Sequence, residues 1–324
     1  MKVRLAMTVG DPRGIGPEIV AKALADPRVG ERCDIVVVGP EGAGVAVTEP
    51  VERWLPKSGA AGPARAALAG RLSGLAIERA VEMALGGLVD GIVTAPIDKA
   101  ALLAGGYDFP GHTEMLASLT GSRVAMMLAS DKLRVVLATT HIPLRRVTET
   151  LSAESIIDTA RITREGLREW FGIAEPRIAL CALNPHAGDA GRFGSEDTEL
   201  LAPAARAAGI DGPFPADTVF VRAMRGEFDA VIAPYHDVGM TAIKVASFGS
   251  AVNITLGLPF PRTSPDHGTA LDIAGQNRAD ASSMIAATLL CASIAARAQA
   301  RGGRRGHGDR PTDSRSAARP SRAR

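Results

Sequence analysis

Short apolar runs alternate with longer amphipathic stretches along most of this chain. The runs are rich in Val, Ile, Leu and Ala and span about four to seven residues, which is typical of buried strands. The stretches between them repeat apolar residues at the spacing of one helix face. Strands are expected over Val3–Val9, Asp34–Val38, Gly91–Thr94, Arg123–Leu128, Leu133–Ala138, Arg177–Leu183, Ala230–Ala233 and Ala251–Leu256. Helices are expected over Pro17–Ala25, Ser73–Leu85, Ser152–Trp170 and Glu196–Ala208.

This order of elements predicts an α/β protein with a mainly parallel sheet covered by helices. The 324 residues are 46% hydrophobic, enough for one large domain or two moderate ones. The segment 41–70 is rich in Gly, Ala and Pro and is expected to be a loop with one irregular helix. Aromatic residues make up only 4%, which argues against a stacking platform for single-stranded nucleic acid.

The formal net charge of +2 is unevenly distributed along the chain. Residues 301–324 hold eight arginines and two aspartates, a net of +6, so the whole-chain value of +2 leaves −4 for the rest. The same segment is rich in Gly, Ser and Pro and has few residues to bury. We therefore expect residues 302–324 to form a disordered appendage, and we expect no nucleic-acid partner.

The three cysteines lie in or beside apolar stretches and form no CxxC pair: Cys33, Cys181 and Cys291. This usage is typical of structural thiols in a reducing compartment. The apolar stretch at the amino terminus is too short for a signal peptide. The segment Ser282–Ala298 is interrupted by Ser and Thr and fits a buried helix better than a membrane span. These observations predict a cytoplasmic protein without a membrane partner.

Three histidines each follow one of the predicted strands. His141, His186 and His236 lie just beyond three of the apolar runs, at separations of 45 and 50 residues. If these strands are parallel neighbours, all three imidazoles leave the sheet at its carboxyl edge, where ligands bind in open α/β sheets. Imidazole ligation suits zinc or another divalent transition ion. The sequence therefore predicts a metal site built from distant residues; for each histidine taken alone, a structural role is the alternative.

Two loops have the composition of an anion-binding site. The loop Gly10–Glu18 closes the first strand, and its glycines let the backbone approach a ligand at the start of a helix. Its spacing differs from the dinucleotide pattern GxGxxG, and a plain tight turn is the alternative. The segment Asp108–Glu114 places His112 and Thr113 on a Pro-Gly turn before a helical run, where they could contact phosphate or carboxylate. The alternative is that Thr113 caps the helix.

The longest polar cluster runs from Tyr235 to Ala270. His, Asp, Lys, Asn and Arg alternate there with small residues around short apolar runs, so many groups that are costly to bury gather together. Such density is more typical of a binding site than of a core.

Seven motifs stand in order along the chain: Gly10-Asp-Pro-Arg-Gly-Ile-Gly-Pro-Glu18, Pro110-Gly-His-Thr-Glu114, Asn184-Pro-His-Ala-Gly188, Pro215-Ala-Asp-Thr218, Tyr235-His-Asp237, Val252-Asn-Ile-Thr-Leu-Gly-Leu-Pro259 and Arg262-Thr-Ser-Pro-Asp-His-Gly-Thr-Ala270. Together they closely resemble the 4-hydroxythreonine-4-phosphate dehydrogenase family of vitamin B6 biosynthesis. The resemblance covers about residues 3–300 and leaves only the Arg-rich tail outside.

The resemblance implies a role for each residue that matches a family motif. Metal ligands fall on His141, His186 and His236. Two residues with a catalytic role are implied, Asp217 supporting the metal and Lys244 as a proton carrier or carboxylate partner. Substrate-binding residues fall on His112, Thr113, Lys244, Asn253 and Arg262. Cofactor-binding residues fall on Gly10, Asp11, Gly14, Asp266, His267 and Gly268.

A wider resemblance to isocitrate and isopropylmalate dehydrogenases implies two α/β domains with mainly parallel sheets. The first domain would comprise residues 1–128 and 265–301 on the cofactor side, and the second would comprise residues 129–264 with the metal and dimer contacts. The active site would lie in the interdomain cleft of a homodimer and be shared between the subunits. The implied cofactors are NAD or NADP and one divalent metal per subunit: zinc, magnesium or cobalt.

The implied reaction is oxidation of 4-phosphohydroxy-L-threonine to 2-amino-3-oxo-4-phosphobutanoate, which loses carbon dioxide to give 3-amino-2-oxopropyl phosphate. The chain departs from the family pattern at Arg13, Val238 and Thr241. Similar enzymes that oxidise phosphorylated threonate or erythronate, or an aromatic dihydrodiol carboxylate, are therefore alternatives. Outside this class, a metal-dependent hydrolase would leave the loop 266–270 without a purpose, and a phosphate acyltransferase would not need the three histidines.

Overall fold

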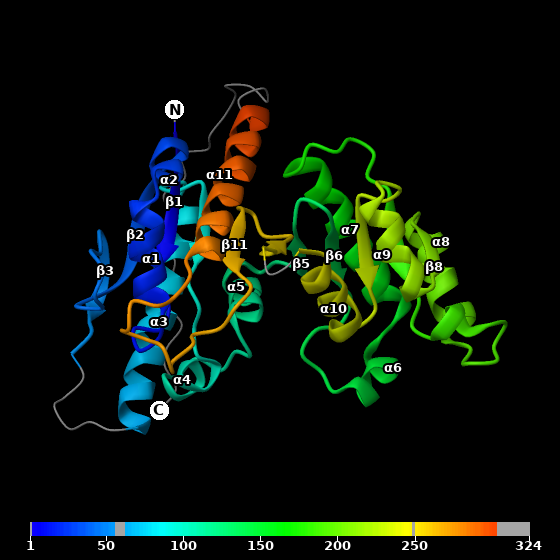
Figure 1. Ribbon diagram of the computed structural model, residues 1–324, viewed down its shortest axis with the longest axis horizontal. Helices are drawn as coiled ribbons and strands as arrows, with labels where there is room; N and C mark the ends of the chain where they lie inside the picture. The colour runs from blue at the N-terminus through cyan, green and yellow to red at the C-terminus, as the bar shows by residue number, and fades with distance from the viewer. Residues whose placement is uncertain (1, 56–61, 248–249, 303–324) are drawn as a thin grey trace, which may run out of the picture.

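A single mixed sheet runs through the described part of this computed structural model, which comprises residues 2–55, 62–247 and 250–302 (Figure 1). Its strands are β1 (Val3–Thr8), β2 (Cys33–Glu41), β3 (Glu49–Arg53), β4 (Gly91–Thr94), β5 (Ala125–Ala129), β6 (Arg134–Leu137), β7 (Ile178–Cys181), β8 (Asp211–Phe214), β9 (Ala230–Ala233), β10 (Val252–Leu256) and β11 (Arg262–Pro265). They lie in the order β3-β2-β1-β4-β11-β10-β5-β6-β9-β7-β8.

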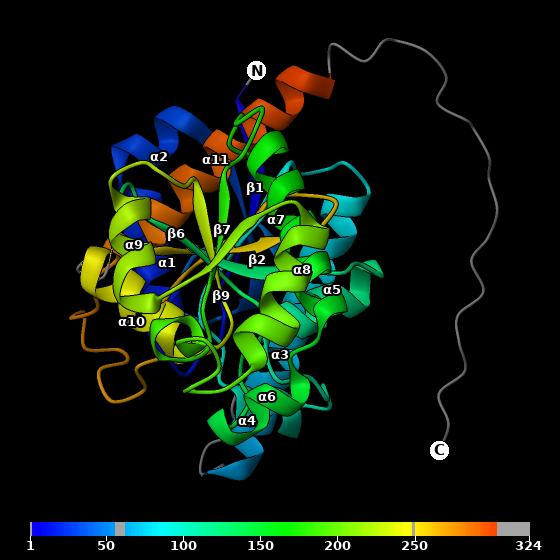
Figure 2. The same cartoon turned by 90° about the vertical axis from the view of Figure 1, so that its right-hand side faces the viewer.

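Two parallel halves of the sheet are joined by an antiparallel centre. Strands β3, β2, β1, β4 and β11 are parallel to one another, and so are β6, β9, β7 and β8. Between them, β10 and β5 pair antiparallel with each other and with their outer neighbours. Three antiparallel pairs in succession make the two halves run in opposite directions. Figure 2 shows the strands fanned out across the molecule, as the twist that accumulates over a large sheet requires.

Helices cover both faces of the sheet. One face carries α1 (Gly16–Ala25), α2 (Pro27–Arg32), α7 (Ala153–Glu169), α8 (Ala202–Ala208) and α11 (Ser282–Gly302). The other carries α3 (Pro63–Leu85), α4 (Lys99–Ala104), α5 (His112–Thr120), α9 (Ala216–Met224) and α10 (His236–Ser247). The short segments are η1 (Leu144–Arg146), α6 (Val147–Thr150), η2 (Pro185–Gly188) and η3 (Asp197–Leu201).

The two faces have differently organised cores. Under α1, α7, α8 and α11, a single hydrophobic cluster runs through both halves of the sheet and includes Met7, Ile254 and Ile162. On the opposite face, the cluster under α3 to α5 is separate from the cluster under α9 and α10. Side chains on successive residues of a strand point to opposite faces. The central strands β5 and β10 therefore present one face to a continuous core and the other to a gap between two cores.

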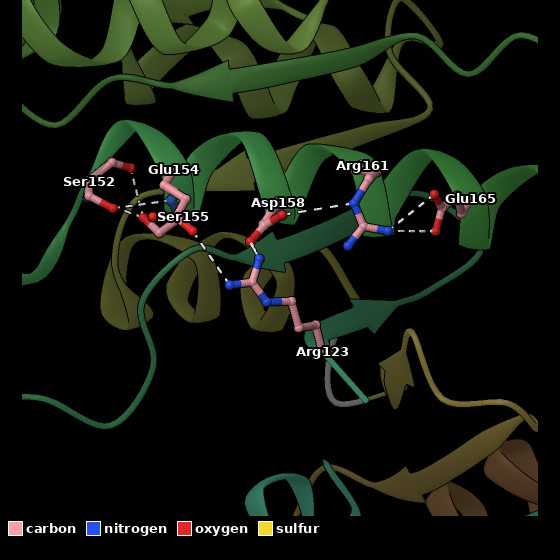
Figure 3. Close-up of polar contacts among 7 residues, drawn as sticks. All are labelled: Arg123, Ser152, Glu154, Ser155, Asp158, Arg161 and Glu165. Carbon is pink, nitrogen blue, oxygen red and sulfur yellow. Dashed lines mark hydrogen bonds and ion pairs between the residues drawn. The ribbon is translucent and has the colours of Figure 1, made fainter. Parts of the chain in front are cut away.

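Polar contacts also fix the position of α7 beside β5. Arg123, two residues before β5, forms ion pairs with Glu154 and Asp158 of α7 (Figure 3). The helix begins with a capping box in which Ser152 and Ser155 bond to each other's backbone N–H groups. An exposed ion pair contributes at most about 1 kcal/mol. Burial against the continuous core is therefore the larger contribution to the packing of α7.

The apolar segment Ser282–Ala298 forms the buried helix that the sequence predicts. Among the described residues, the window Ser282–Ala300 of α11 is long and apolar enough to cross a membrane. Met284 and Cys291 are nevertheless fully buried, and α11 packs on β4, β11 and α1. It is a central element of the continuous core.

All eight predicted strands are present, with ends that differ by a few residues, but three strands were not predicted. One of them, β3, lies in the segment 41–70, for which the expectation of a loop with one irregular helix is wrong. Its sequence, Glu49–Arg53, is mostly charged because β3 is an edge strand and half exposed. The segment also holds the start of α3 at Pro63, while residues 56–61 lie outside the described residues. The division into two domains stays a prediction, and the predicted tail lies outside the described residues beyond 302.

The turn that follows β10 requires glycine. Gly257 has φ +89°, and a Cβ atom there would lie 2.2 Å from the carbonyl oxygen of Arg123. We expect Gly257→Ala to lower the free energy of unfolding by about 3 kcal/mol, because backbone strain and a clash add. Gly226→Ala is the matched control, since Gly226 has φ +85° with no atom within 4 Å, and should cost about 1 kcal/mol. Equal losses in urea unfolding would contradict the predicted clash.

Candidate active site

A pocket of about 680 Å³ lies on the face of the sheet where the two cores are separate. Its walls come from both halves of the molecule: α5, α10, the central strands β5 and β10, and the segments that follow β4, β6, β9 and β11. It brings together ten of the residues predicted from the sequence: His112, Thr113, His141, His236, Lys244, Asn253, Arg262, Asp266, His267 and Gly268.

The most unusual group in this pocket is a buried cation without an acid partner. Arg262 is only 1% exposed, and its Nη1 and Nη2 donate to the hydroxyls of Thr255 and Thr94 at 3.0 and 2.5 Å. Its Nε is buried without an acceptor, and no ion pair to Arg262 occurs in the described part of the chain. Burial lowers the pKa of Arg262 to about 10. Neutral hydroxyl groups therefore hold the guanidinium in place, and it remains able to bind an anionic ligand.

Other polar atoms of the pocket also lack partners. His112 Nε2, Asn253 Oδ1 and His267 Nε2 are buried and make no hydrogen bond within the described structure. Burial lowers the pKa of His112 well below its ordinary value, and the charge of Arg262 adds to this effect. Buried polar atoms usually have hydrogen-bond partners. Several orphaned donors and acceptors in one pocket indicate a binding site for a polar ligand.

The strands that carry the three histidines are parallel neighbours, as the sequence suggests. They lie in the order β6, β9, β7, and His141 and His236 follow the first two. The rings of His141 and His236 have centroids 5.5 Å apart, and His236 Nδ1 lies 2.7 Å from Asp237 Oδ1. A carboxylate on one ring nitrogen fixes the tautomer and leaves the other nitrogen for a metal. Two of the three predicted ligands therefore come together.

His186 lies apart from the other two histidines. It sits in η2, where its own φ of 54° and that of Ala187 carry the chain through the left-handed region. With Asp217 and Tyr235 it lines a separate pocket of about 330 Å³. In residues 2–55, 62–247 and 250–302, no three His, Cys, Asp or Glu side chains are grouped closely enough to hold a metal ion. One chain thus supplies an incomplete set of the predicted ligands.

Lys244 projects from α10 toward the loop that follows β11. Its Nζ lies 3.6 Å from Asp266 Oδ2, and the Asp266 side chain is largely buried while that of Lys244 is half exposed. The ammonium group is therefore oriented by one carboxylate and still accessible to a ligand in the pocket.

The first loop packs against the same region but lines a different pocket. Asp11 is fully buried and paired with Arg13, and a Cβ atom on Gly14 would lie 2.7 Å from the carbonyl oxygen of Thr269. Gly14 lines a second pocket of about 490 Å³, whereas Gly10 and Asp11 line neither this pocket nor the main one. A Cβ atom on Gly10 would lie 2.4 Å from the carbonyl oxygen of Pro96, so this glycine serves the tight turn.

Five polar residues that line the pocket were not predicted as site residues: Thr94, Lys99, Glu114, Thr241 and Ser264. Thr255, which accepts a hydrogen bond from Arg262, was not predicted either. Thr94 ends a predicted strand, so the carboxyl-edge rule could have found it. Thr255 lies inside a strand and carries no such signal. For Thr113 the capping explanation is wrong, since the residue before α5 is Gly111 and Thr113 lies within the first turn.

Fold and pocket together define an α/β enzyme with a site for a small anionic ligand. A profile of the family described as "Pyridoxal phosphate biosynthetic protein PdxA" matches residues 46–291. A 4-hydroxythreonine-4-phosphate dehydrogenase of Desulfosudis oleivorans is 44% identical over 315 residues, which cover 87% of this chain and 93% of that protein. The chain therefore belongs to the PdxA family, and its resemblance to dehydrogenases of this kind is confirmed, as is the expectation of an oxidoreductase.

Solved structures agree with this family. A 4-hydroxythreonine-4-phosphate dehydrogenase from Klebsiella pneumoniae superposes with a TM-score of 0.80 at 39% identity, covering 91% of this chain and all of its own. A terephthalate 1,2-cis-dihydrodiol dehydrogenase from Burkholderia xenovorans superposes with a TM-score of 0.62 at 27% identity, covering 90% of this chain and 98% of its own. The α/β fold with a mixed, mostly parallel sheet is the fold of these enzymes.

The lowered pKa of His112 makes folding sensitive to acid. Between its folded-state pKa and the ordinary value near 6.5, the unfolded chain binds more protons, so the free energy of unfolding falls as the pH falls. We expect His112→Asn to reduce this slope by up to about 1.4 kcal/mol per pH unit between about pH 5 and 6.5. Urea unfolding at a series of pH values measures it. Thr113→Ala, next in the chain and without a titrating group, should keep the wild-type slope, and an unchanged slope in His112→Asn would contradict the argument.

Proposed function

We propose that the chain is a metal-dependent, NAD(P)-linked dehydrogenase that oxidises 4-phosphohydroxy-L-threonine in pyridoxine 5'-phosphate biosynthesis. The observation that carries this proposal is the buried guanidinium of Arg262, which forms no ion pair among the described residues, in a pocket that also contains the His141 and His236 pair. The first group suits a phosphate or carboxylate, and the second suits a divalent ion. A phosphorylated hydroxy acid presents a group for each of them, its phosphate or carboxylate for the first and its hydroxyl for the second.

Charge determines where the phosphate binds. Arg262 offers a free Nε–H, His112 lies close enough for the guanidinium to lower its pKa, and Thr113 lies in the first turn of α5. The amino terminus of that helix also favours negative charge. We assign phosphate binding to these three residues, together with Asn253 on the central strand β10.

The metal would be held by imidazoles. His141 and His236 supply two donors, and neutral imidazole is the form that binds zinc or cobalt. His186 and Asp217 lie in a separate pocket. Tyr235 lines that pocket and also a small cavity beside His141 and His236. We propose that the third ligand, His186, is contributed by a second copy of the chain, so that a homodimer completes each site.

The remaining residues transfer protons or orient the groups that do so. A divalent ion held by His141 and His236 would lower the pKa of the substrate alcohol, and a nicotinamide bound beside it would supply the hydride acceptor for oxidation at carbon 3. Lys244 pairs with the substrate carboxylate or removes the hydroxyl proton, and Asp266 orients its ammonium group. The product is a β-keto acid, 2-amino-3-oxo-4-phosphobutanoate, which loses carbon dioxide to give 3-amino-2-oxopropyl phosphate.

The nicotinamide cofactor would lie along the loop after β11. Asp266, His267 and Gly268 line the main pocket, and the neighbouring pocket of about 490 Å³ contains Gly14 and Arg13. The proposal includes NAD or NADP as the cofactor, zinc, magnesium or cobalt as the metal, and a cytoplasmic enzyme without nucleic-acid or membrane partners. Gly10 and Asp11 would then shape the first loop rather than contact the cofactor.

A second candidate substrate is an aromatic cis-dihydrodiol carboxylate. The relationship to the Burkholderia xenovorans enzyme favours it, since that protein is 27% identical and is a terephthalate dihydrodiol dehydrogenase. A dihydrodiol carboxylate too would present a carboxylate to Arg262 and a secondary alcohol to the metal. Phosphorylated threonate or erythronate is a third possibility of the same chemical type.

The proposed reaction is tested by following the absorbance of reduced nicotinamide. Protein treated with a chelator should be inactive on 4-phosphohydroxy-L-threonine with NAD or NADP, and added zinc, magnesium or cobalt should restore turnover with release of carbon dioxide. A terephthalate dihydrodiol and 4-phospho-erythronate are the comparison substrates. Absence of turnover on all three with every metal, from folded protein, would refute the dehydrogenase assignment.

The shared metal site is tested at His186. His186→Ala should lose bound metal and reduce kcat by at least about a hundredfold while the protein remains folded. His267→Ala is the matched control, because His267 lines the pocket outside the proposed metal ligands and should keep the metal content. Full metal content in His186→Ala would exclude His186 as a ligand. Mixing His186→Ala with His141→Ala chains should restore part of the activity if the site is shared, because mixed dimers contain one intact ligand set.

A further inference from the structure

A second cavity, of about 440 Å³, lies behind the candidate active site. Ala129 of β5 and Val252 of β10 line it, whereas the next residues, Leu128 and Asn253, line the active-site pocket. Because side chains alternate between the faces of a strand, the two cavities have the same two strands as a common wall. We call the second one the rear cavity. It opens on the face of the sheet that carries the continuous core.

The two halves of the molecule meet around the rear cavity. Leu290 and Ile294 reach it from α11, and Trp170 and Phe171 reach it from the end of α7. Figure 1 shows α11 and α7 on either side of the central strands. Trp170 is 7% exposed, so it packs into the core with one edge at the cavity. These side chains give the cavity an apolar wall that suits a flat or branched apolar group.

A half-buried guanidinium lines the same cavity. Arg134 begins β6, its guanidinium lies 4.9 Å from the centroid of the Phe171 ring, and its Nη1 donates to the carbonyl oxygen of Asp229 at 3.1 Å. Its Nε is buried and has no acceptor in the described structure. Burial lowers the pKa of Arg134, and the nearby carboxylate of Asp229, which is itself paired with Arg177, partly opposes this shift. A buried N–H without an acceptor costs about 1 to 3 kcal/mol, so an acceptor on a ligand would be stabilising.

The charge around the rear cavity favours an anion. A second guanidinium, that of Arg297 on α11, lines it and donates from Nη1 to the carbonyl oxygen of Phe171 at 2.5 Å. Among the described residues that line the cavity, Asp131 is the one acid, and its side chain is exposed. Two guanidinium groups that bond to neutral carbonyls therefore stand beside an apolar wall. This combination matches a carboxylate attached to an apolar body.

We propose that the rear cavity is a second ligand site, distinct from the active site, which binds a small carboxylate with an aromatic or branched apolar body. The carboxylate accepts a hydrogen bond from Arg134 Nε, and the body packs against Trp170, Leu290 and Ile294. The site bridges α11 and α7, so a bound ligand contacts both halves of the sheet. The proposal does not depend on the reaction catalysed on the other side of β5 and β10.

The probe is benzoate, and Trp170 is the reporter. The chain has two tryptophans, so Trp54→Phe leaves Trp170 as the single tryptophan, which can be excited separately from the two tyrosines. We expect a saturable change in its fluorescence with benzoate and none with benzyl alcohol, which has the same ring without the charge. In this background, Arg134→Met should weaken binding about tenfold or more, the loss expected for one hydrogen bond to a charged group. Arg161→Met is the matched control, because Arg161 lies on the exposed side of α7 and pairs with Glu165 (Figure 3).

A second variant tests the cavity without removing a charge. Ser293 is exposed on α11 and lines the rear cavity, so Ser293→Phe should fill it and abolish binding while circular dichroism stays unchanged. Equilibrium dialysis of benzoate against the wild-type protein checks the result without a fluorescent reporter. Absence of saturable binding, or equal binding by wild type, Arg134→Met and Ser293→Phe, would overturn the proposal. No nicotinamide or phosphorylated substrate is present, so the outcome is independent of the dehydrogenase assay.

Discussion

The antiparallel pairing of β5 with β10 is the constraint on which the rest of the structure depends. It joins two parallel halves that run in opposite directions, and it has different surroundings on its two faces. Met127 and Ile254 point into a core that is continuous through both halves, while Leu128 and Asn253 point into the pocket between two separate cores. The alternation of side chains along two short strands thus holds the molecule together and leaves a site open.

The candidate site contains a buried charge, that of Arg262, which no ion pair in the described structure neutralises. Arg262 bonds to two threonine hydroxyls, and desolvating a guanidinium without a carboxylate destabilises the folded chain. A carboxylate in place of Thr94 or Thr255 would pair with Arg262 and remove much of that cost. It would also occupy the guanidinium that an anionic ligand needs. An unpaired cation at this position is therefore explained by the proposed binding of a phosphate or carboxylate and not by stability.

The sequence predicted where the strands lie along the chain better than it predicted the direction in which each strand runs in the sheet. Apolar runs such as Gly91–Thr94 and Ala230–Ala233 were found to the residue, because buried strands between helices need continuous apolar sequence. The same pattern does not distinguish a parallel from an antiparallel strand, so the orientation of β5 and β10 could not be foreseen. Most predicted site residues meet in one pocket, but not at one edge of the sheet: the two halves run in opposite directions, and the residues gather over the face of the central strands β5 and β10. Thr255 could not be found from the sequence, since it is buried within a strand and its partner is known only from the pairing of β10 with β11.

The separation of His186 from the other two histidines shows the limit of the strand-edge argument. Neighbouring strands lie about 4.8 Å apart, so the ends of β6 and β7, with β9 between them, are already about 10 Å apart. His141 and His236 follow adjacent strands and bring their rings together, whereas η2 turns through the left-handed region and carries His186 to a separate pocket. A shared edge therefore brings two residues together but not three. A three-histidine metal site in this fold needs either a movement of η2 or a histidine from another subunit, and the second route requires no change in the packed sheet.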